Sequence, residues 1–341
     1  MKLSVHLITW NGGQYIPFLC ASLRNQTYKD WTLCILDNHS TDHTVALLQK
    51  ELINFPVQSR LMVNADNKGF AGGHNQVYAQ TDSEYFLLLN QDLYIAPDCF
   101  EKLMAAIEGD QHLAVVSPRL LQWNFSRISE DFEASLTTII DSLGLQVLRN
   151  RRVIEIGGGS TWKDNESSRV SVFGVSGTMP LFRRASIKNI AFSEHEFFDA
   201  SYGSYKEDVD LAYRLQAAGF GAAIITGAYA YHDRSAAGPK ELSDTAAMKN
   251  KQQQSSWIQY HSYKNHLMTL YKNEYSQNSL LDFPWIFWYE LKKFVWFMIF
   301  KPSVLRGLGE IWRARRTLHA KRIYIKKHRM ITWRTIRTWW L

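Results

Sequence analysis

The sequence contains few cysteines, and their number and spacing exclude two classes of protein. Its 341 residues include only Cys20, Cys34 and Cys99. An odd number of cysteines without paired spacing indicates neither a disulfide framework nor a cysteine-rich zinc site. Each lies among apolar neighbours, so we interpret all three as small core residues of a protein in the reducing cytosol. The apolar N-terminal stretch, residues 1–11, is too short for a signal peptide and predicts a first strand.

Acidic residues are scarce at the C-terminal end of the chain. Residues 301–341 contain 12 lysines and arginines and one acid, Glu310, a balance of +11; because the whole chain carries +7, residues 1–300 carry −4. Basic residues among aromatic ones can bind nucleic acids, but the sequence contains no recognised nucleic-acid-binding module. We therefore expect no nucleic-acid partner. The proportions of hydrophobic (46%) and charged (21%) residues are those of a folded chain.

Apolar runs recur at the spacing of alternating strands and helices. Five of them predict strands, at residues 5–9, 32–36, 60–64, 85–89 and 113–117. The intervening residues 14–25 and 41–52 place apolar side chains at helical spacing. This alternation predicts an α/β fold with a mainly parallel sheet flanked by helices. Right-handed connections then bring the carboxyl ends of the strands to one edge.

A carboxylate follows the most apolar of these strands. The run from Tyr85 to Leu89 is uninterrupted, as in a strand buried on both faces, and it stops at Asn90, Gln91 and Asp92. Ligands bind at the carboxyl edge of such sheets, where a hard oxygen donor suits Mg²⁺ or Mn²⁺ held partly by a substrate's phosphates. Alternatively, Asp92 only opens a turn.

Polar and glycine-rich segments follow two other predicted strands. Asp37 ends the second strand, where it could accept the N3 hydrogen of a uracil or thymine ring; helix capping is the alternative, and it suits Asp42 better. Residues 67–75, NKGFAGGHN, combine three glycines with the start of a helical pattern, so backbone N–H groups could approach a phosphate. This segment matches neither the dinucleotide-binding GxGxxG motif nor the P-loop.

Taken together, four motifs carry a resemblance to a known family. ITWNG, DNHSTD, NKGFAGGHN and LLNQD, in this order and spacing, resemble the N-terminal half of a family 2 glycosyltransferase of the GT-A fold, and NxGFAGGxN is similar to its rhamnosyltransferase-like branch. The resemblance implies a nucleotide-sugar site lined by Thr9, Asp37 and Asn67, and we expect Gly72 of the glycine-rich segment to belong to the same site. It also implies that Asp92 is the metal-binding acid of the DxD-type motif. Asn90 stands where many relatives have the first acid of that motif, which implies a modest affinity for metal.

The second half contains two further apolar segments of interest. Residues 172–184 predict a strand interrupted by Gly174 and Gly177, either because a bound sugar approaches the backbone at Gly177 or because the strand has a bulge. Residues 140–147, IDSLGLQV, resemble a short motif of the same branch, and the residues do not reveal its role.

The segment YKEDVDLAYRLQAAGF, residues 205–220, predicts a helix with acids in its first turn. The helix dipole favours negative charge there and keeps a carboxylate such as Glu207 or Asp208 ionised, as a general base requires, although such acids often only stabilise a helix. The segment resembles the ED-x-D-L-x-x-R-L motif of the family, which implies that Asp208 is the catalytic base. His232 ends the next apolar strand; it could be a core histidine, and the resemblance implies that it completes the metal shell beside Asp92.

Residues 283–300, FPWIFWYELKKFVWFMIF, raise the question of a membrane span. Glu290, Lys292 and Lys293 interrupt the segment, so we expect it to lie along the membrane surface instead. The segment that follows is basic and contains interspersed tryptophans, and we expect it to face anionic lipid. These tryptophans are Trp312, Trp333, Trp339 and Trp340. Packing on the catalytic domain or on a second subunit is the alternative.

These observations predict a GT-A domain in residues 1–247, with a nucleotide-binding half (1–120) and an acceptor half (121–247), and a helical membrane-associating extension in residues 248–341. The expected function is inverting, metal-dependent transfer of a sugar, with rhamnose suggested, from a dTDP- or UDP-sugar to a glycan or lipid-linked acceptor of cell-surface polysaccharide. The expected location is the inner face of the cell membrane. The alternatives are a sugar nucleotidyltransferase and an inactive membrane-bound scaffold.

Overall fold

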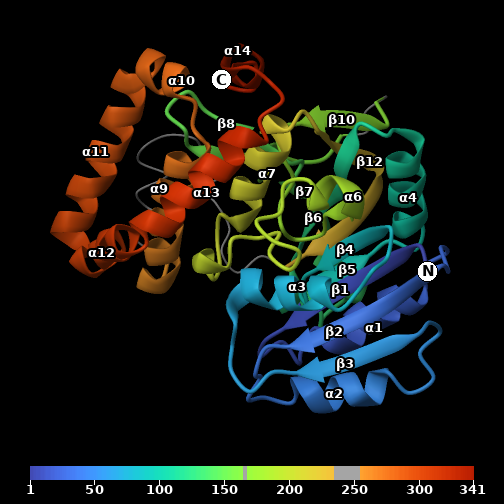
Figure 1. Ribbon diagram of the computed structural model, residues 1–341. Coiled ribbons are helices and arrows are strands. Elements are labelled where there is room, and N and C mark those ends of the chain that lie inside the picture. The colour runs from blue at the N-terminus through green and yellow to red at the C-terminus, as the bar shows by residue number, and fades with distance from the viewer. Residues whose placement is uncertain (164–166, 234–253) are drawn as a thin grey trace.

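The computed structural model describes residues 1–163, 167–233 and 254–341, and its centre is one large mixed sheet (Figure 1). Along the sheet the order is β10-β12-β6-β11-β4-β1-β2-β3, with β5 beside β12 and β7 beside β6. The strands are β1 (Leu3–Thr9), β2 (Trp31–Asp37), β3 (Ser59–Val63), β4 (Tyr85–Leu89), β5 (Leu93–Ile95), β6 (Leu113–Trp123), β7 (Leu136–Ser142), β10 (Arg169–Val172), β11 (Leu181–Arg183) and β12 (Gly221–His232). A separate antiparallel pair is formed by β8 (Leu145–Val147) and β9 (Val153–Glu155).

The sheet is parallel in its first half and mixed in its second. Strands β1 to β4 are parallel to one another, so the polar segments that follow them meet at one edge, as the sequence predicts. Strand β11 lies between β4 and β6 and is antiparallel to both, whereas β12 is parallel to β6. The α/β class with helices flanking a central sheet is confirmed, and each antiparallel pair in the described part of the sheet includes a strand that follows β4 in the chain.

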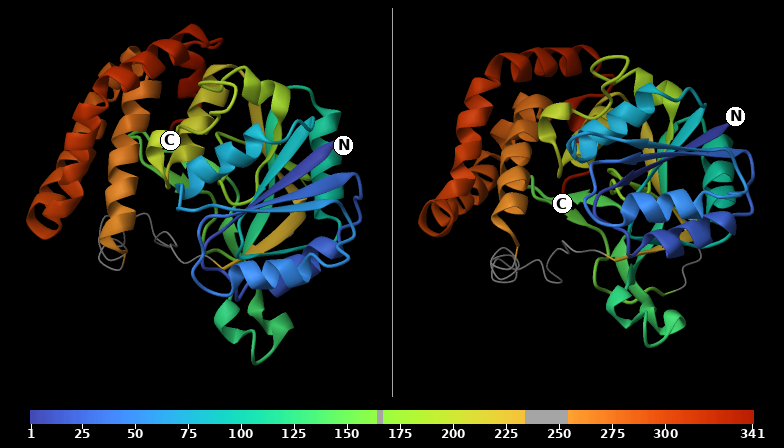
Figure 2. Two further views of the ribbon diagram at one scale, coloured as in Figure 1. Left: turned by 60° about the horizontal axis from the view of Figure 1, so that its bottom comes forward. Right: turned by 90° about the horizontal axis from the view of Figure 1, so that it is seen from below.

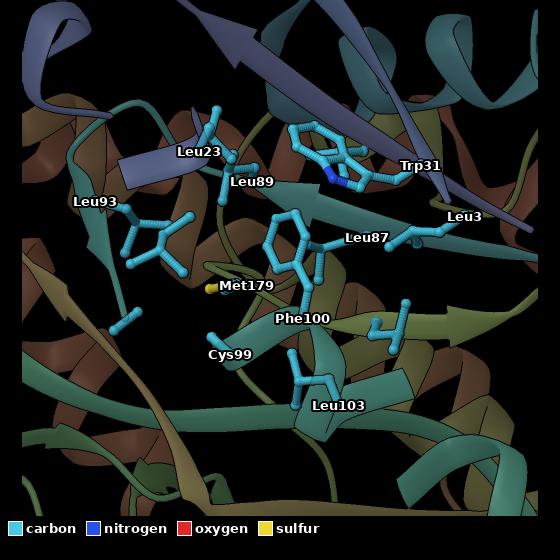
Figure 3. Close-up of a cluster of buried hydrophobic side chains, with 14 of the residues drawn as sticks. Leu3, Leu23, Trp31, Leu87, Leu89, Leu93, Cys99, Phe100, Leu103 and Met179 are labelled. Carbon is cyan, nitrogen blue, oxygen red and sulfur yellow. The ribbon is translucent and has the colours of Figure 1, made fainter. Parts of the chain in front are cut away.

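Helices cover both faces of the sheet. Those before the C-terminal region are α1 (Ile16–Arg24), α2 (Thr44–Glu51), α3 (Gly69–Ala79), α4 (Cys99–Gly109), α5 (Phe132–Ser135), α6 (Arg184–Lys188) and α7 (Glu207–Ala217), with the 3₁₀ turns η1 (Phe125–Arg127) and η2 (Ala200–Tyr202). Side chains of α1, α2 and α4 share one core cluster, part of which is drawn in Figure 3, and side chains of α3, α6 and α7 share another. Strand β4 alternates between them, because Leu87 and Leu89 point into the first cluster and Phe86 and Leu88 into the second.

The C-terminal helices lie on the side of the molecule away from β3 (Figures 1 and 2). They are α9 (Ser256–Asn273), α10 (Ser276–Leu281), α11 (Phe283–Phe300), α12 (Arg306–Arg313), α13 (Arg315–Lys327) and α14 (Trp333–Arg337), with η3 (Pro302–Leu305) before α12. Helix α9 contacts α7 through buried charges: Lys272 Nζ lies 3.0 Å from Asp210 Oδ1. None of the helices in the described ranges has the length and apolar character required to span a bilayer.

Two details of the sequence analysis need correction. Residues 172–184 do not form one strand, because β10 ends at Val172 and β11 begins only at Leu181, in a different part of the sheet. The tryptophans of the tail do not all face outward. Trp333, Trp339 and Trp340 pack against a core cluster formed with Phe173 and Tyr213, whereas Trp312 is 68% exposed.

Candidate active site

Thr9 and Asp37 join the loops that follow β1 and β2. Both residues are fully buried, and Thr9 Oγ1 donates a hydrogen bond to Asp37 Oδ2 (2.9 Å). The backbone N–H of Ser40 donates to Asp37 Oδ1 (2.8 Å), and the Ser40 hydroxyl donates to Asp37 Oδ2 (2.6 Å). Asp37 therefore fixes the shape of this loop, and a contact between its carboxylate and a base stays a prediction.

The glycine-rich segment is shaped by close backbone contacts. Gly69 begins α3 with φ of +71°, and a Cβ atom there would lie 2.7 Å from the carbonyl oxygen of Gly203. Asn67 is exposed, and its Oδ1 accepts the N–H of Gly69 (2.8 Å); Gly72, in the first turn of α3, is half-buried. Asn38 supports the segment from beneath, since its side chain accepts the N–H of Lys68 (3.0 Å) and donates to the carbonyl of Gly69 (3.0 Å).

Asp92 and His232 lie side by side, as the metal-site prediction requires. The carboxylate precedes β5, the histidine ends β12, and these strands pair with Leu93 opposite His232. Asp92 Oδ1 lies 3.4 Å from His232 Nε2, and Asp141 Oδ2 lies 2.9 Å from His232 Nδ1 on the other side of the ring. Burial opposes protonation of this imidazole, but the carboxylates of Asp92 and Asp141 outweigh burial and raise the pKa of His232 to about 10.

These donors fit a divalent cation whose coordination shell is completed by a phosphate-bearing substrate. Bonds from Mg²⁺ to its ligands are about 2.0–2.1 Å long, so two ligand atoms 3.4 Å apart can share one ion. Within residues 1–163, 167–233 and 254–341, no three His, Cys, Asp or Glu side chains are grouped around one metal position. Asp92 and His232 would thus supply two ligands, and the remaining positions suit diphosphate oxygens and water.

Asp208 is the accessible residue of an otherwise buried helix. Every other residue of α7, from Glu207 to Ala217, is buried. Asp208 Oδ1 accepts the N–H of Val209 (2.7 Å), and Oδ2 accepts the N–H of Gly177 (3.1 Å). The carboxylate is therefore fixed in orientation while part of it remains open to solvent.

Glu207 differs from Asp208, although both lie in the first turn of α7. Its side chain is buried, and Oε2 has no hydrogen-bond partner among the described residues. Burial, reinforced by the neighbouring Asp208 carboxylate, raises the pKa of Glu207 well above its usual value. The expectation that the helix dipole keeps Glu207 ionised is wrong, because desolvation outweighs the dipole.

Backbone contacts connect the two acids. The N–H of Asn90, two residues before Asp92, donates to the carbonyl of Thr178 (3.2 Å), and the adjacent Gly177 donates to Asp208. A Cβ atom on Gly177 would lie 3.5 Å from the Phe70 ring of α3, so the glycine-rich segment also contacts this place. The structure thus brings together the segment that follows β4, the start of α7 and the start of α3.

Sequence reasoning missed three residues that shape this site: Asn38, Gln91 and Asp141. The Gln91 side chain makes two hydrogen bonds with the backbone of Trp10, from Nε2 to the carbonyl (3.0 Å) and from the Trp10 N–H to Oε1 (2.9 Å). Asn38 and Gln91 lie within the motifs that were recognised, so their polar character was the available signal. Asp141 lies in IDSLGLQV, a motif whose role the sequence did not reveal.

Comparison with known proteins identifies the family. A family model described as glycosyl transferase family 2 matches residues 4–190, more than half of the chain. The chain belongs to glycosyl transferase family 2. Within this family it is 30% identical over 114 residues to the chondroitin synthase of Escherichia coli, a match that covers 33% of this chain and 16% of that protein. Two further relatives, from Bacillus subtilis and Haemophilus influenzae, are covered over 43% and 36% of their lengths, so the chain spans less than half of each.

Solved structures of similar fold extend the comparison beyond the region of sequence similarity. The mannosyltransferase PcManGT of Pyrobaculum calidifontis, in complex with GDP-Man and Mn²⁺, is 14% identical with a TM-score of 0.53, and the match covers 96% of this family 2 chain and 85% of that protein. TarS 1–349 of S. aureus, in complex with UDP, is 16% identical with a TM-score of 0.53 over 96% and 89% of the two chains. At these identities the likeness shows the fold, which is the GT-A fold predicted from the sequence.

Proposed function

We propose that this chain transfers a sugar from a nucleotide diphosphate sugar to an acceptor hydroxyl, with inversion at the anomeric carbon. The observation that supports this best is that both acids are held next to the same two residues. Asn90, two residues before Asp92, donates a backbone hydrogen bond to Thr178, and the backbone of Gly177 donates one to Asp208. A single cleft there would hold the leaving diphosphate beside the first acid and the acceptor beside the second.

Asp92 and His232 act on the leaving group in this proposal. Mg²⁺ or Mn²⁺ bound to both would neutralise charge on the diphosphate as it departs. The nucleotide itself would be bound by the loop that Thr9 and Asp37 shape and by the backbone near Asn67, Gly72 and Gly177. The Mn²⁺ and GDP-Man in the complex of the similar mannosyltransferase support this assignment.

Asp208 acts on the acceptor. As the acceptor oxygen bonds to the anomeric carbon, the bond from that carbon to the diphosphate breaks, and the acceptor proton moves to the Asp208 carboxylate. The hydrogen bonds from Gly177 and Val209 hold the carboxylate in position for this transfer. Attack on the face opposite the leaving diphosphate inverts the anomeric configuration.

The substrates that we propose are a dTDP- or UDP-sugar and a glycan or lipid-linked acceptor of surface polysaccharide synthesis. The NKGFAGGHN segment, similar to the rhamnosyltransferase-like branch, supports rhamnose as the sugar. A lipid-linked acceptor is supported by α11, which presents apolar side chains to solvent, among them Phe287, Trp288 and Ile299. We propose that this face lies on the inner surface of the cell membrane.

A panel of nucleotide sugars tests the function. The melting temperature of the protein would be measured with dTDP-rhamnose, UDP-GlcNAc and GDP-mannose, each with Mn²⁺ and with EDTA, since a ligand that binds only the folded state raises its stability. We expect the largest metal-dependent increase with the dTDP-sugar, and a product of inverted configuration by NMR when acceptor is added. Pyrophosphate release from a nucleoside triphosphate would instead reveal a nucleotidyltransferase, and no binding or turnover with any donor would indicate a scaffold.

A further inference from the structure

Asp141 contacts the proposed metal ligand His232 from the side that faces away from Asp92. Its side chain is buried on β7, and Oδ2 lies 2.9 Å from His232 Nδ1 across 91 positions of sequence. Nε2 of the same ring lies 3.4 Å from Asp92 Oδ1. The imidazole therefore lies between two carboxylates, and each of its nitrogens has its own oxygen neighbour.

The sheet holds these groups in register. His232 pairs with Leu93 of β5 on one side and with Gln122 of β6 on the other, so its backbone is fixed between two strands. Strand β7 pairs with the neighbouring part of β6, where Ile140 is opposite Leu121. Asp141, the next residue, is thereby placed within reach of the His232 ring.

A histidine ring can rotate, and in its neutral form either nitrogen can hold the proton. An acceptor at Nδ1 selects the form with hydrogen on Nδ1, which leaves the lone pair of Nε2 free for a cation. Carboxylates that bind the distal nitrogen of a metal-bound histidine fix both ring orientation and protonation in this way. The geometry of Asp141 is that of such a group.

We propose that Asp141 is the positioning residue for His232, orienting its ring so that Nε2 and Asp92 bind one divalent cation together. This assigns a role to the IDSLG segment, and it rests on the metal-dependent function proposed above. Asp141 would touch neither the cation nor the sugar. Its removal should weaken metal binding while leaving the chemistry of Asp208 intact.

The test compares Asp141→Ala and Asp141→Asn with Thr137→Val. Thr137 is on the same strand. Its hydroxyl donates to the carbonyl of Gln122 (2.7 Å) and accepts the N–H of Ile139 (3.2 Å), so its replacement removes nearby hydrogen bonds without removing a contact of the His232 ring. Mn²⁺ affinity would be measured by electron paramagnetic resonance in the presence of UDP or dTDP. We expect Asp141→Ala to weaken Mn²⁺ binding by about 10–100-fold. Asp141→Asn, which retains an oxygen of the same shape, should weaken it less, and Thr137→Val should bind Mn²⁺ as the wild type does.

A second measurement separates this inference from the proposed function. In the metal-free protein, the Nδ1 proton bonded to Asp141 should give a low-field proton resonance, assigned by its loss in His232→Gln. Loss of that resonance in Asp141→Ala supports the positioning role of Asp141, whether or not the wild type binds Mn²⁺. Absence of Mn²⁺ binding by the wild type would overturn the proposed metal dependence but not the contact between Asp141 and His232. Should Asp141→Ala fail to fold, Asp141→Asn decides through its Mn²⁺ affinity. Mn²⁺ binding of wild-type strength in the folded Asp141 variants would overturn the inference.

Discussion

Asp208 is reactive in our proposal because of its exposure, which its neighbours on α7 lack. Replacement by asparagine keeps a side chain of the same size that can accept the Gly177 N–H but is too weak a base for the acceptor proton. We expect Asp208→Asn to lower kcat by about 10²–10⁴-fold. Binding of the nucleotide sugar, measured by calorimetry, should be unchanged.

Glu207→Gln is the matched control. Burial raises the pKa of Glu207 and so favours its neutral carboxyl group, which an amide of the same shape resembles. We expect a much smaller loss of kcat than in Asp208→Asn. Equal losses in the two variants would count against Asp208 as the base and would assign the effect to disturbance of the helix start.

Gly69 permits a second prediction at the residue scale. Its positive φ disfavours side chains, and a Cβ atom would collide with the carbonyl of Gly203. We expect Gly69→Ala to lower the free energy of unfolding by about 1–3 kcal/mol. Gly309→Ala should raise it by up to about 1 kcal/mol, because alanine favours a helix and, in the described ranges, no atom outside the adjacent residues and the backbone of its own helix lies within 4 Å of the position that its Cβ would occupy. Urea denaturation measures both, and equal stabilities of the two variants would contradict the contact with Gly203.

At the scale of elements, α9 and α11 meet through a buried ionic cluster. His266 Nε2 lies 2.8 Å from Glu290 Oε1, and Lys293 Nζ lies 3.3 Å from the same oxygen. Burial and the positive charge of Lys293 lower the pKa of His266 to about 4, despite the opposing effect of Glu290. The neutral imidazole can donate to Glu290, whose charge Lys293 already balances.

This cluster should make stability sensitive to acid. Below its ordinary pKa of 6.5, His266 binds a proton in the unfolded chain but, until about pH 4, not in the folded one, so stability falls as the pH decreases through this range. We expect His266 to contribute a loss of roughly 1–2 kcal/mol between pH 7 and pH 5. His266→Gln retains a donor for Glu290 and does not titrate, so its stability should fall less over the same range. Parallel stability profiles of the two proteins would contradict this assignment.

The sequence predicted the elements with local signals more accurately than those defined by distant contacts. Strand β4 and helix α7 were found because burial on two faces and helical spacing are visible within a dozen residues. The strand expected at residues 172–184 was wrong because its apolar character reflects burial of a loop against α7, where a Cβ atom on Gly174 would lie 2.4 Å from that of Ala212. No local pattern distinguishes these two causes.

The same limit applied to the site. Asp92 follows a strand, Asp208 lies in the first turn of a helix and His232 ends a strand, and sequence patterns reveal such positions. The contact between Asp141 and His232 joins segments 91 residues apart, and only the pairing of β5, β6, β7 and β12 brings them together. Asp199 and Asp210 likewise bind Lys272 in a region that sequence patterns assigned to a separate extension.

At the scale of the whole molecule, α11 differs from an ordinary surface helix because its apolar side faces outward and its charged side faces inward. Its inward side includes Glu290 and Lys293 with Trp296 and Phe297, whereas its outward side is apolar. Two of the three charges that argue against a membrane span, Glu290 and Lys293, thus face the protein. Exposed arginines follow on the next two helices: Arg306, Arg313, Arg315 and Arg316. An apolar surface beside cationic groups is typical of helices that lie on anionic lipid.

Vesicle sedimentation tests this face. The triple variant Phe287→Ser, Trp288→Ser and Ile299→Ser removes outward side chains that are all more than half exposed. We expect wild-type protein to bind vesicles containing phosphatidylglycerol and the triple variant to bind them at least tenfold more weakly, with little change in melting temperature. Trp340→Ser, at a packed position, should instead lower the melting temperature. Undiminished vesicle binding by the triple variant would exclude α11 as the contact.

Helix α9 contacts both the outward-facing α11 and helix α7, which carries Asp208 in its first turn, and buried charges and hydrogen bonds fix it at both contacts. With α11 resting on a bilayer, the cleft would therefore stand at a constant height above the lipid surface. In our proposal, acceptor selectivity would then depend on distance from the membrane. Hydroxyl groups at one distance from the lipid headgroups would be glycosylated, and identical sugars nearer to or farther from the membrane would not.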